Sequence, residues 1–130
     1  MKHSKPFYKY VKGRVVSGLG EGSRYVSLYS ELFEKYLGFK PYPGTLNIVV
    51  ENTTVSMDSI VNKIVIPPPG NGYVSVYAYR AYIYGVEVVY VVKPMITKHG
   101  REIDEVVSRY NLRERYCLRD GSIVELLIMV

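Results

Sequence analysis

Three glycines near the N-terminus, Gly18, Gly20 and Gly22, stand two residues apart in the segment S-G-L-G-E-G. Glycine adopts backbone conformations that other residues avoid, and it lets backbone N–H groups come close to a phosphate. The spacing matches neither the dinucleotide-binding fingerprint nor the Walker loop. We do not expect a helix to begin at Gly22, so a helix dipole is not predicted to assist. The segment is therefore consistent with a phosphate cradle or with a glycine-rich β-turn.

A hydroxyl and an amide form the second group, in P-G-T-L-N. On a strand, Thr45 and Asn47 are two residues apart and share one face. Both carry oxygen atoms of the kind that Mg²⁺ prefers, and Mg²⁺ takes few protein ligands when it also binds phosphates and water. The pair can therefore form part of a magnesium site. Alternatively, it is a polar strand start that faces solvent.

A polar stretch nearer the C-terminus is the third group. It contains Thr97 and Glu105 and ends in N-L-R-E. The arginine of that motif, Arg113, can bind a phosphate or a base, and it can also pair with Glu114 or Asp120. Neither histidine of the chain has a cysteine or a carboxylate at a spacing typical of a metal site or a catalytic triad. The stretch alone does not decide between binding and structure.

Segments rich in Tyr and Val must position these groups, and such residues favour strands. We predict strands over residues 14–17, 25–28, 45–50, 73–83, 86–92 and 123–129, and helices over residues 30–37, 101–110 and 112–118. Ser30 is the predicted N-cap of the first helix, Gly38 its predicted end, and Tyr84-Gly85 the predicted turn of a hairpin. Because the helices do not alternate with the strands, the pattern favours a mainly β fold, a small closed barrel, over a βαβ sheet.

Composition limits the class of protein. The 130 residues suit one domain, and the net charge of +5 suits an anionic ligand such as a nucleotide, a phosphate or RNA. Cys117 is the single cysteine, which excludes an internal disulfide, and we expect it in the core. No apolar run has the length of a signal peptide or a membrane span, so we predict a cytoplasmic protein with no membrane partner. Residues 1–12 are predicted to form a basic and aromatic tail, and residues 13–130 the barrel domain.

Taken together, the motifs resemble one family. V-V-S-G-L-G-E-G followed by Y-V-S-L, then F-E-K-Y-L-G-F-K-P-Y-P-G-T-L-N, then N-L-R-E near a D-G turn, is similar to the archaeal CTP-dependent riboflavin kinases over residues 13–129. The joint occurrence of the glycine segment and the P-Y-x-G-T-L-N segment is specific, whereas neither is specific alone. The resemblance implies a six-stranded cradle-loop β-barrel with two or three short helices. It also implies an enzyme that converts riboflavin and CTP to FMN and CDP. We expect the protein to be a monomer and to bind no nucleic acid.

The resemblance also implies roles for individual residues. The nucleotide-binding residues would be Gly18, Leu19, Gly20, Glu21, Gly22, Ser23, Asn111, Leu112, Arg113 and Glu114. Arg24 is the alternative to Ser23 as the last residue of the first segment. Mg²⁺ would bind Thr45 and Asn47, and the flavin would contact Thr97 and Glu105. If the transfer uses a general base, Glu105 or Asp104 is the nearest candidate.

Two other functions remain open at the level of sequence. One is a non-catalytic barrel that binds nucleic acid or regulates transcription, which the basic charge and the tail of residues 2–12 would support. The other is a flavin-binding module without transfer activity. The presence of Thr45 and Asn47 argues against that module, since flavin binding alone needs no metal ligands.

Overall fold

The structure is a computed structural model that describes residues 7–18, 21–51, 62–94 and 103–130. Within these residues the chain forms seven strands and two helices. In chain order they are β1 (Tyr8–Val16), α1 (Glu21–Leu37), β2 (Leu46–Val50), β3 (Ile64–Ile66), β4 (Val76–Ile83), β5 (Glu87–Pro94), β6 (Ile103–Val107), α2 (Leu112–Arg115) and β7 (Ile123–Met129). Neither helix is long and apolar enough to cross a membrane, as far as the described residues extend.

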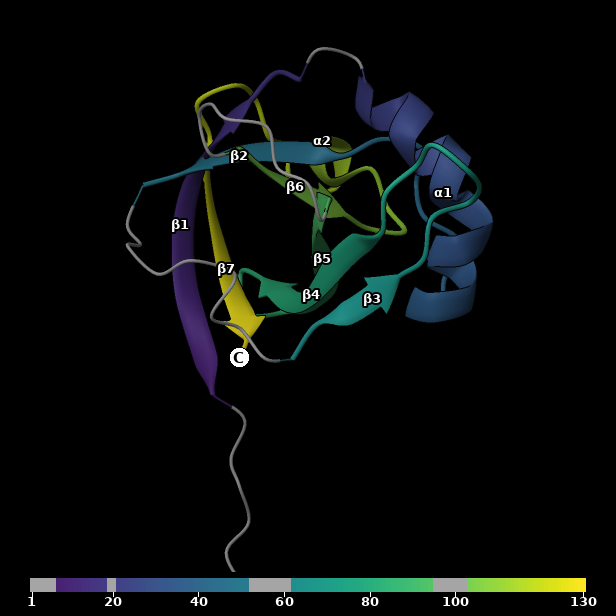
Figure 1. Cartoon of the computed structure of the whole chain (residues 1–130). Coiled ribbons are helices and arrows are strands. Elements are labelled where there is room, and N and C mark those ends of the chain that lie inside the picture. Colours follow the sequence, from purple (N-terminus) through teal and green to yellow (C-terminus); the bar gives the residue numbers. More distant parts are fainter. Residues whose placement is uncertain (1–6, 19–20, 52–61, 95–102) are drawn as a thin grey trace, which may run out of the picture.

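Six of the strands close into an antiparallel barrel (Figure 1). The strand order is β3-β4-β5-β6-β2-β1-β7, and β7 also pairs with β4, which completes the ring. The strand β3 pairs with β4 and lies beside the ring as an added strand. Closure pairs the backbone groups that an open sheet would leave at its edges. The predicted mainly β fold with a six-stranded barrel is confirmed.

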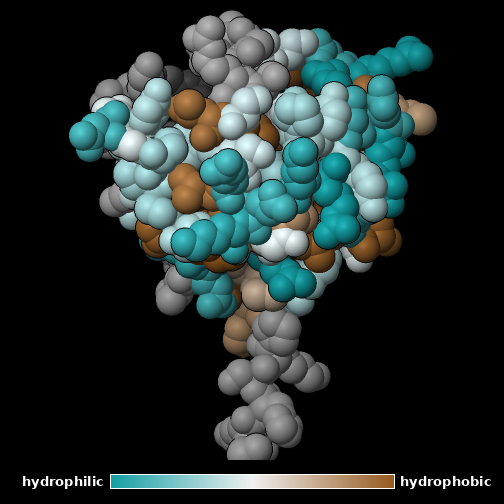
Figure 2. Space-filling view, turned by 90° about the vertical axis from the view of Figure 1, so that its right-hand side faces the viewer, coloured by the Kyte–Doolittle hydropathy of each residue, from teal (hydrophilic) through white to brown (hydrophobic). Residues whose placement is uncertain are grey.

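Buried side chains form two clusters, one inside the barrel and one beneath α1. The outer cluster contains one face of α1, namely Val26, Tyr29, Phe33 and Leu37, against residues of β3, β4 and β5 such as Ile66, Val76 and Tyr90. The spacing of three and four residues places these four side chains on one side of the helix. The helix therefore lies on the outside of the barrel, next to β3 (Figure 1). The side of the molecule that carries α1 is mostly hydrophilic, with small separate hydrophobic areas (Figure 2).

The first helix corrects two predictions. Residues 25–28 belong to α1 and not to a strand, and the helix begins at Glu21, well before the predicted N-cap Ser30. The reason is that Val26 packs in line with the later buried residues of the helix. The predicted end is confirmed, because Gly38 follows the helix with φ +84° and donates its N–H to the Glu34 carbonyl at 3.0 Å.

Three further predictions were wrong. Residues 103–107 of the predicted helix 101–110 form β6, because β5 and β2 both pair with this segment. The first strand begins at Tyr8 and not at Arg14, so residues 8–12, which we expected in a tail, pair with β7. Cys117 is exposed and not part of the core. By contrast, the hairpin turn at Tyr84-Gly85 is confirmed, since it joins the paired strands β4 and β5.

Candidate active site

The predicted metal ligand Asn47 lies in the middle of a row of side chains across three strands. It pairs with Val16 of β1 on one side and with Glu105 of β6 on the other. Its neighbours Leu46 and Ile48 are buried in the barrel core, so Asn47 and Glu105 face outward. Opposed residues of an antiparallel pair have Cβ atoms about 4.5–5.5 Å apart. The fold thus places a predicted flavin contact next to a predicted metal ligand.

Thr45 and Asn47 also contact each other. The Thr45 hydroxyl donates to Asn47 Oδ1 at 3.1 Å, which confirms that the two side chains share a face. In an octahedral Mg²⁺ shell with bonds of about 2.0–2.1 Å, adjacent ligand oxygens are roughly 2.9 Å apart. The two oxygens are therefore spaced as neighbouring ligands of such an ion. Within the described residues no group of three His, Cys, Asp or Glu side chains could hold a metal elsewhere.

The first glycine of the glycine segment lies against Asn47. A Cβ atom added to Gly18 would be 2.1 Å from Asn47 Nδ2, so any larger residue there would force the Asn47 amide out of its position. Leu19 and Gly20 lie outside the described residues, and α1, 17 residues long, begins at Glu21 directly after them. Our expectation that no helix begins here was wrong. The N-terminus of α1, where N–H groups and the helix dipole favour anions, therefore follows Gly18 and Gly20 and includes Gly22.

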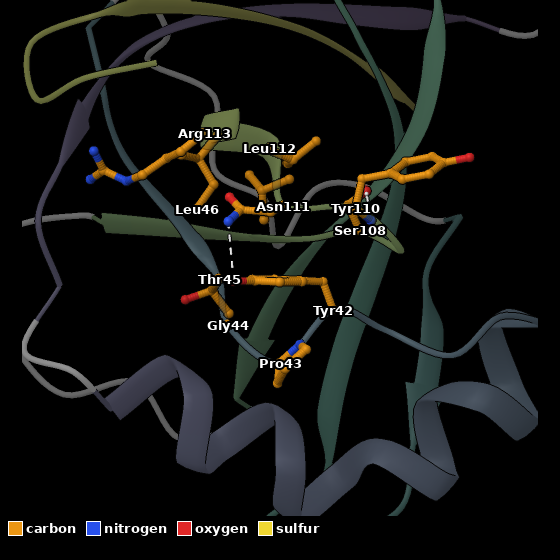
Figure 3. Close-up of a pocket in the computed structure, with 11 residues that line it drawn as sticks. Tyr42, Pro43, Gly44, Thr45, Leu46, Ser108, Tyr110, Asn111, Leu112 and Arg113 are labelled. Atoms are coloured by element: carbon orange, nitrogen blue, oxygen red, sulfur yellow. Dashed lines mark hydrogen bonds between the residues drawn. The ribbon is translucent and has the colours of Figure 1, made fainter. Parts of the chain in front are cut away.

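Arg113 connects α2 to the end of β1. Its Nη2 atom donates to Asp120 Oδ1 at 2.8 Å and to the Val16 carbonyl at 3.3 Å. The sequence allowed Arg113 to pair with either Glu114 or Asp120, and in the structure it pairs with Asp120. The guanidinium accordingly points away from Tyr42 (Figure 3). The second oxygen of Asp120 accepts from the Ser17 hydroxyl at 2.5 Å. The hydrogen bond from Ser17 and the one from Arg113 lower the pKa of Asp120 below its usual value.

A cavity of about 240 Å³ lies between the start of β2 and α2 (Figure 3). Its lining includes Thr45 and residues 111–113, so two of the predicted groups face the same space. Asn111 is the N-cap of α2: its Oδ1 accepts from the Glu114 N–H at 3.4 Å, while its Nδ2 donates to the Tyr42 hydroxyl at 3.1 Å. Gly44, with φ +153°, allows the chain to turn from Tyr42 into β2.

Other predicted residues contribute less or cannot be placed. Leu112 is 4% exposed and belongs to the barrel core, so its side chain has a structural role. Glu114 is exposed. Glu21, Gly22 and Ser23 lie in the first turn of α1, and Thr97 lies outside the described residues. Sequence reasoning did not select Tyr42, Ser108 or Tyr110, which line the cavity. Of these three residues, only Tyr42 lies within a motif that the sequence analysis used, P-Y-P-G-T-L-N.

Known proteins are similar to this chain over most of its length. A family model named CTP-dep_RFKase, with the description "Domain of unknown function DUF120", matches residues 15–128. A protein named riboflavin kinase from Staphylothermus marinus is 47% identical over 118 residues, which cover 91% of this chain and 90% of that protein. The chain belongs to the CTP-dependent riboflavin kinase family.

Two more relatives, both named riboflavin kinase, show how much of each relative's length this chain covers. The one from Sulfurisphaera tokodaii is 39% identical over 127 residues, or 93% of that protein. The one from Thermococcus kodakarensis is 41% identical over 124 residues, but these cover only 58% of that protein. This chain therefore matches some riboflavin kinases over nearly their whole length and others over little more than half of it. Riboflavin kinases are phosphotransferases, so membership makes the chain an enzyme of that class.

Proposed function

We propose that this chain transfers the γ-phosphoryl group of CTP to the 5′-hydroxyl of the ribityl chain of riboflavin, giving FMN and CDP. One observation supports this assignment above the others. Three residues at the end of β1 each contact a different segment. Val16 accepts a hydrogen bond from Arg113, Ser17 donates one to Asp120, and Gly18 lies against Asn47. Motifs far apart in the sequence thus converge on three consecutive residues.

Phosphoryl transfer depends chiefly on positioning and on the neutralisation of charge. In our proposal the backbone of residues 18–22 and the N-terminus of α1 hold the phosphates from one side. The N-L-R-E segment, with Asn111 fixed as N-cap and Arg113 fixed by Asp120, completes the nucleotide site from the other. Hydrogen bonds from backbone groups of both segments to the cytosine edge would distinguish CTP from ATP, because ATP would leave those groups unpaired.

Thr45 and Asn47 are the residues that would hold a divalent ion. Their oxygens carry no net charge, so they leave the positive charge of a bound ion to offset the phosphates. Such an ion, when bound, stabilises the negative charge that develops during transfer. In our proposal Glu105, opposite Asn47 on β6, orients the ribityl hydroxyl or accepts its proton.

The nucleic-acid-binding alternative loses part of its support. Residues 8–12 of the presumed basic tail form part of β1 and pair with β7. The Tyr10 hydroxyl, moreover, donates to Glu125 Oε2 at 2.6 Å. These residues are therefore not a free arm. Deletion of residues 1–6 should leave turnover intact under our proposal, whereas a nucleic-acid binder that uses this tail would lose affinity and salt dependence.

The assay that tests the proposal is simple. The protein is incubated with riboflavin, Mg²⁺ and either CTP or ATP, and the flavins are separated by chromatography. We expect FMN with CTP and little with ATP. Absence of FMN with both nucleotides would contradict the kinase assignment. Equal rates with both would contradict only the choice of CTP as donor. An EDTA-treated sample serves as the control for the metal, and we expect no FMN from it.

A further inference from the structure

Asp120 joins two segments that the proposed nucleotide site requires. It lies in the turn between α2 and β7, at the D-G pair that precedes the last strand. One of its oxygens accepts from Arg113 Nη2 at 2.8 Å, and the other accepts from the Ser17 hydroxyl at 2.5 Å. Both carboxylate oxygens are thus engaged, one by the N-L-R-E segment and one by the residue that precedes Gly18.

We propose that Asp120 is a positioning residue for the nucleotide: it fixes Arg113 and the end of β1 relative to each other and so sets the width of the site between Gly18, at the end of β1, and the N-L-R-E segment. The inference rests on the proposed function, because it takes these two segments as the two sides of the CTP site. It assigns to Asp120 no contact with the substrates.

The backbone around Asp120 is already held by other bonds. The Gly121 N–H donates to the Val15 carbonyl at 2.8 Å, and the Val15 N–H donates to the Ser122 carbonyl at 2.9 Å. The turn therefore stays on β1 when the Asp120 side chain is changed. The Asp120 side chain adds a shorter bond to Arg113, 2.8 Å, beside the 3.3 Å bond that Arg113 donates directly to the Val16 carbonyl. With a side chain that is 59% exposed, Asp120 has little to contribute to the core.

A carboxylate suits this link better than an amide does. Arg113 and Ser17 both donate hydrogen bonds, so Asp120 must accept from two sides at once. In Asp120→Asn one of the two positions becomes an NH₂ group, which cannot accept. The variant keeps the volume of the side chain, yet it loses the negative charge that strengthens the bond to Arg113, and its NH₂ group can bond Ser17 only if that hydroxyl accepts instead of donating.

The same helix offers a matched control. Arg115, two residues after Arg113, pairs with Glu87 at 2.7 Å from Nη2 to Oε2, and Glu87 also accepts from Arg115 Nε and from the Tyr116 hydroxyl. This ion pair ties α2 to β5 and does not reach β1. Glu87→Gln therefore weakens the attachment of α2 without disturbing the link through Asp120.

The test compares steady-state kinetics of the whole chain. For Asp120→Asn we expect the KM for CTP to rise about tenfold, with kcat and the KM for riboflavin within about twofold of wild type. Ser17→Ala should also raise the KM for CTP, whereas Ser17→Thr, which keeps the hydroxyl, should have a KM for CTP close to that of the wild type. Glu87→Gln should leave the KM for CTP unchanged. In Arg113→Met, adding Asp120→Asn should change little, because the link is already broken.

Some outcomes would overturn the inference. A KM for CTP within twofold of wild type in Asp120→Asn would do so, and so would equal changes for both substrates or the same changes in Glu87→Gln. If the wild type forms no FMN, the proposed function fails separately. In that case CDP binding measured by calorimetry decides: weaker binding by Asp120→Asn supports the positioning role, while equal binding or none by the wild type contradicts it.

Discussion

Two neighbouring rows of side chains cross the same strands of the barrel and differ in chemistry. The outer row contains Asn47 of β2 and Glu105 of β6, which face each other on the outside of the barrel. The inner row, one residue along each strand, contains Ile48 and Asp104. Ile48 is fully buried, and Asp104, 3% exposed, forms an ion pair with Lys93 at 2.6 Å between Nζ and Oδ1.

The comparison separates two carboxylates that are adjacent in sequence. Both Asp104 and Glu105 were candidates for a general base. Successive side chains of a strand point to opposite faces, so only one of the two can share a face with Thr45 and Asn47. That residue is Glu105, whereas Asp104 points into the core and is neutralised by Lys93. The outer row is therefore expected to govern turnover and the inner row to govern stability.

The largest expected effect is that of Asn47→Ala in the outer row. It removes the oxygen that accepts from Thr45 and the amide that lies against Gly18. Loss of a metal ligand and of the support for the glycine segment should lower turnover by about a hundredfold or more, as is typical when charge stabilisation is lost. The rate of FMN formation from CTP measures this, and urea unfolding should show a stability close to wild type.

Val49→Thr is the matched control for that variant. Val49 lies on the same outer face of β2, two residues beyond Asn47, and pairs with Ile103. A substitution of similar volume there should leave turnover within about twofold, since exposed-face changes away from a site have small effects. Near-normal turnover in Asn47→Ala would remove Asn47 from the metal site and would abolish the functional difference between the two rows.

The second-largest expected effect is that of Asp104→Asn in the inner row. Asp104→Asn leaves the Lys93 ammonium, whose side chain is 21% exposed, without its counter-charge. Removal of one partner of a buried pair costs about 3 kcal/mol in the free energy of unfolding. Urea denaturation should show that loss, while the folded fraction should retain kcat. The double variant Lys93→Met, Asp104→Leu should recover much of the stability. A fall in kcat without a fall in stability would instead assign Asp104 to the chemistry.

The fold was predictable from sequence where local patterns agree with tertiary structure. The turn at Tyr84-Gly85 and the end of α1 at Gly38 depend on backbone conformations that neighbouring residues specify. Residues 25–28 read locally as a strand, and only the packing of Val26 with Phe33 and the strands beneath shows that they belong to α1. Similarly, residues 103–107 have helical spacing, but pairing with β5 and β2 makes them a strand.

For the candidate site, too, the sequence predicts local geometry but not contacts between separate elements. The shared face of Thr45 and Asn47 follows from strand geometry alone. The contact of Gly18 with Asn47 and the link from Arg113 through Asp120 to Ser17 join residues from different elements of the barrel. No spacing rule predicts such contacts, because they depend on barrel closure and strand register. The motif resemblance named Gly18, Asn47 and Arg113 as candidate site residues, but it did not give these contacts and did not select Ser17 or Asp120 for the site.

The smallest expected effect in the comparison is that of Glu105→Gln, which keeps the shape of the outer row and removes its charge. We expect the KM for riboflavin to rise about tenfold and kcat to fall less than tenfold, since a loose transition state needs little help from a base. The KM for CTP should stay within about twofold. Initial rates at varied riboflavin and varied CTP measure the three constants.

Glu125→Gln supplies the control for the removal of a negative charge. Glu125 is exposed on β7, which pairs with β1 and β4 and not with β2 or β6. Its variant should match wild type in both KM values. A fall in kcat of about a hundredfold in Glu105→Gln, with the KM for riboflavin unchanged, would mean that Glu105 acts as a general base and not as a flavin contact. Such a result would sharpen the contrast with Asp104, because the strand pleat would then separate a catalytic carboxylate from a structural one.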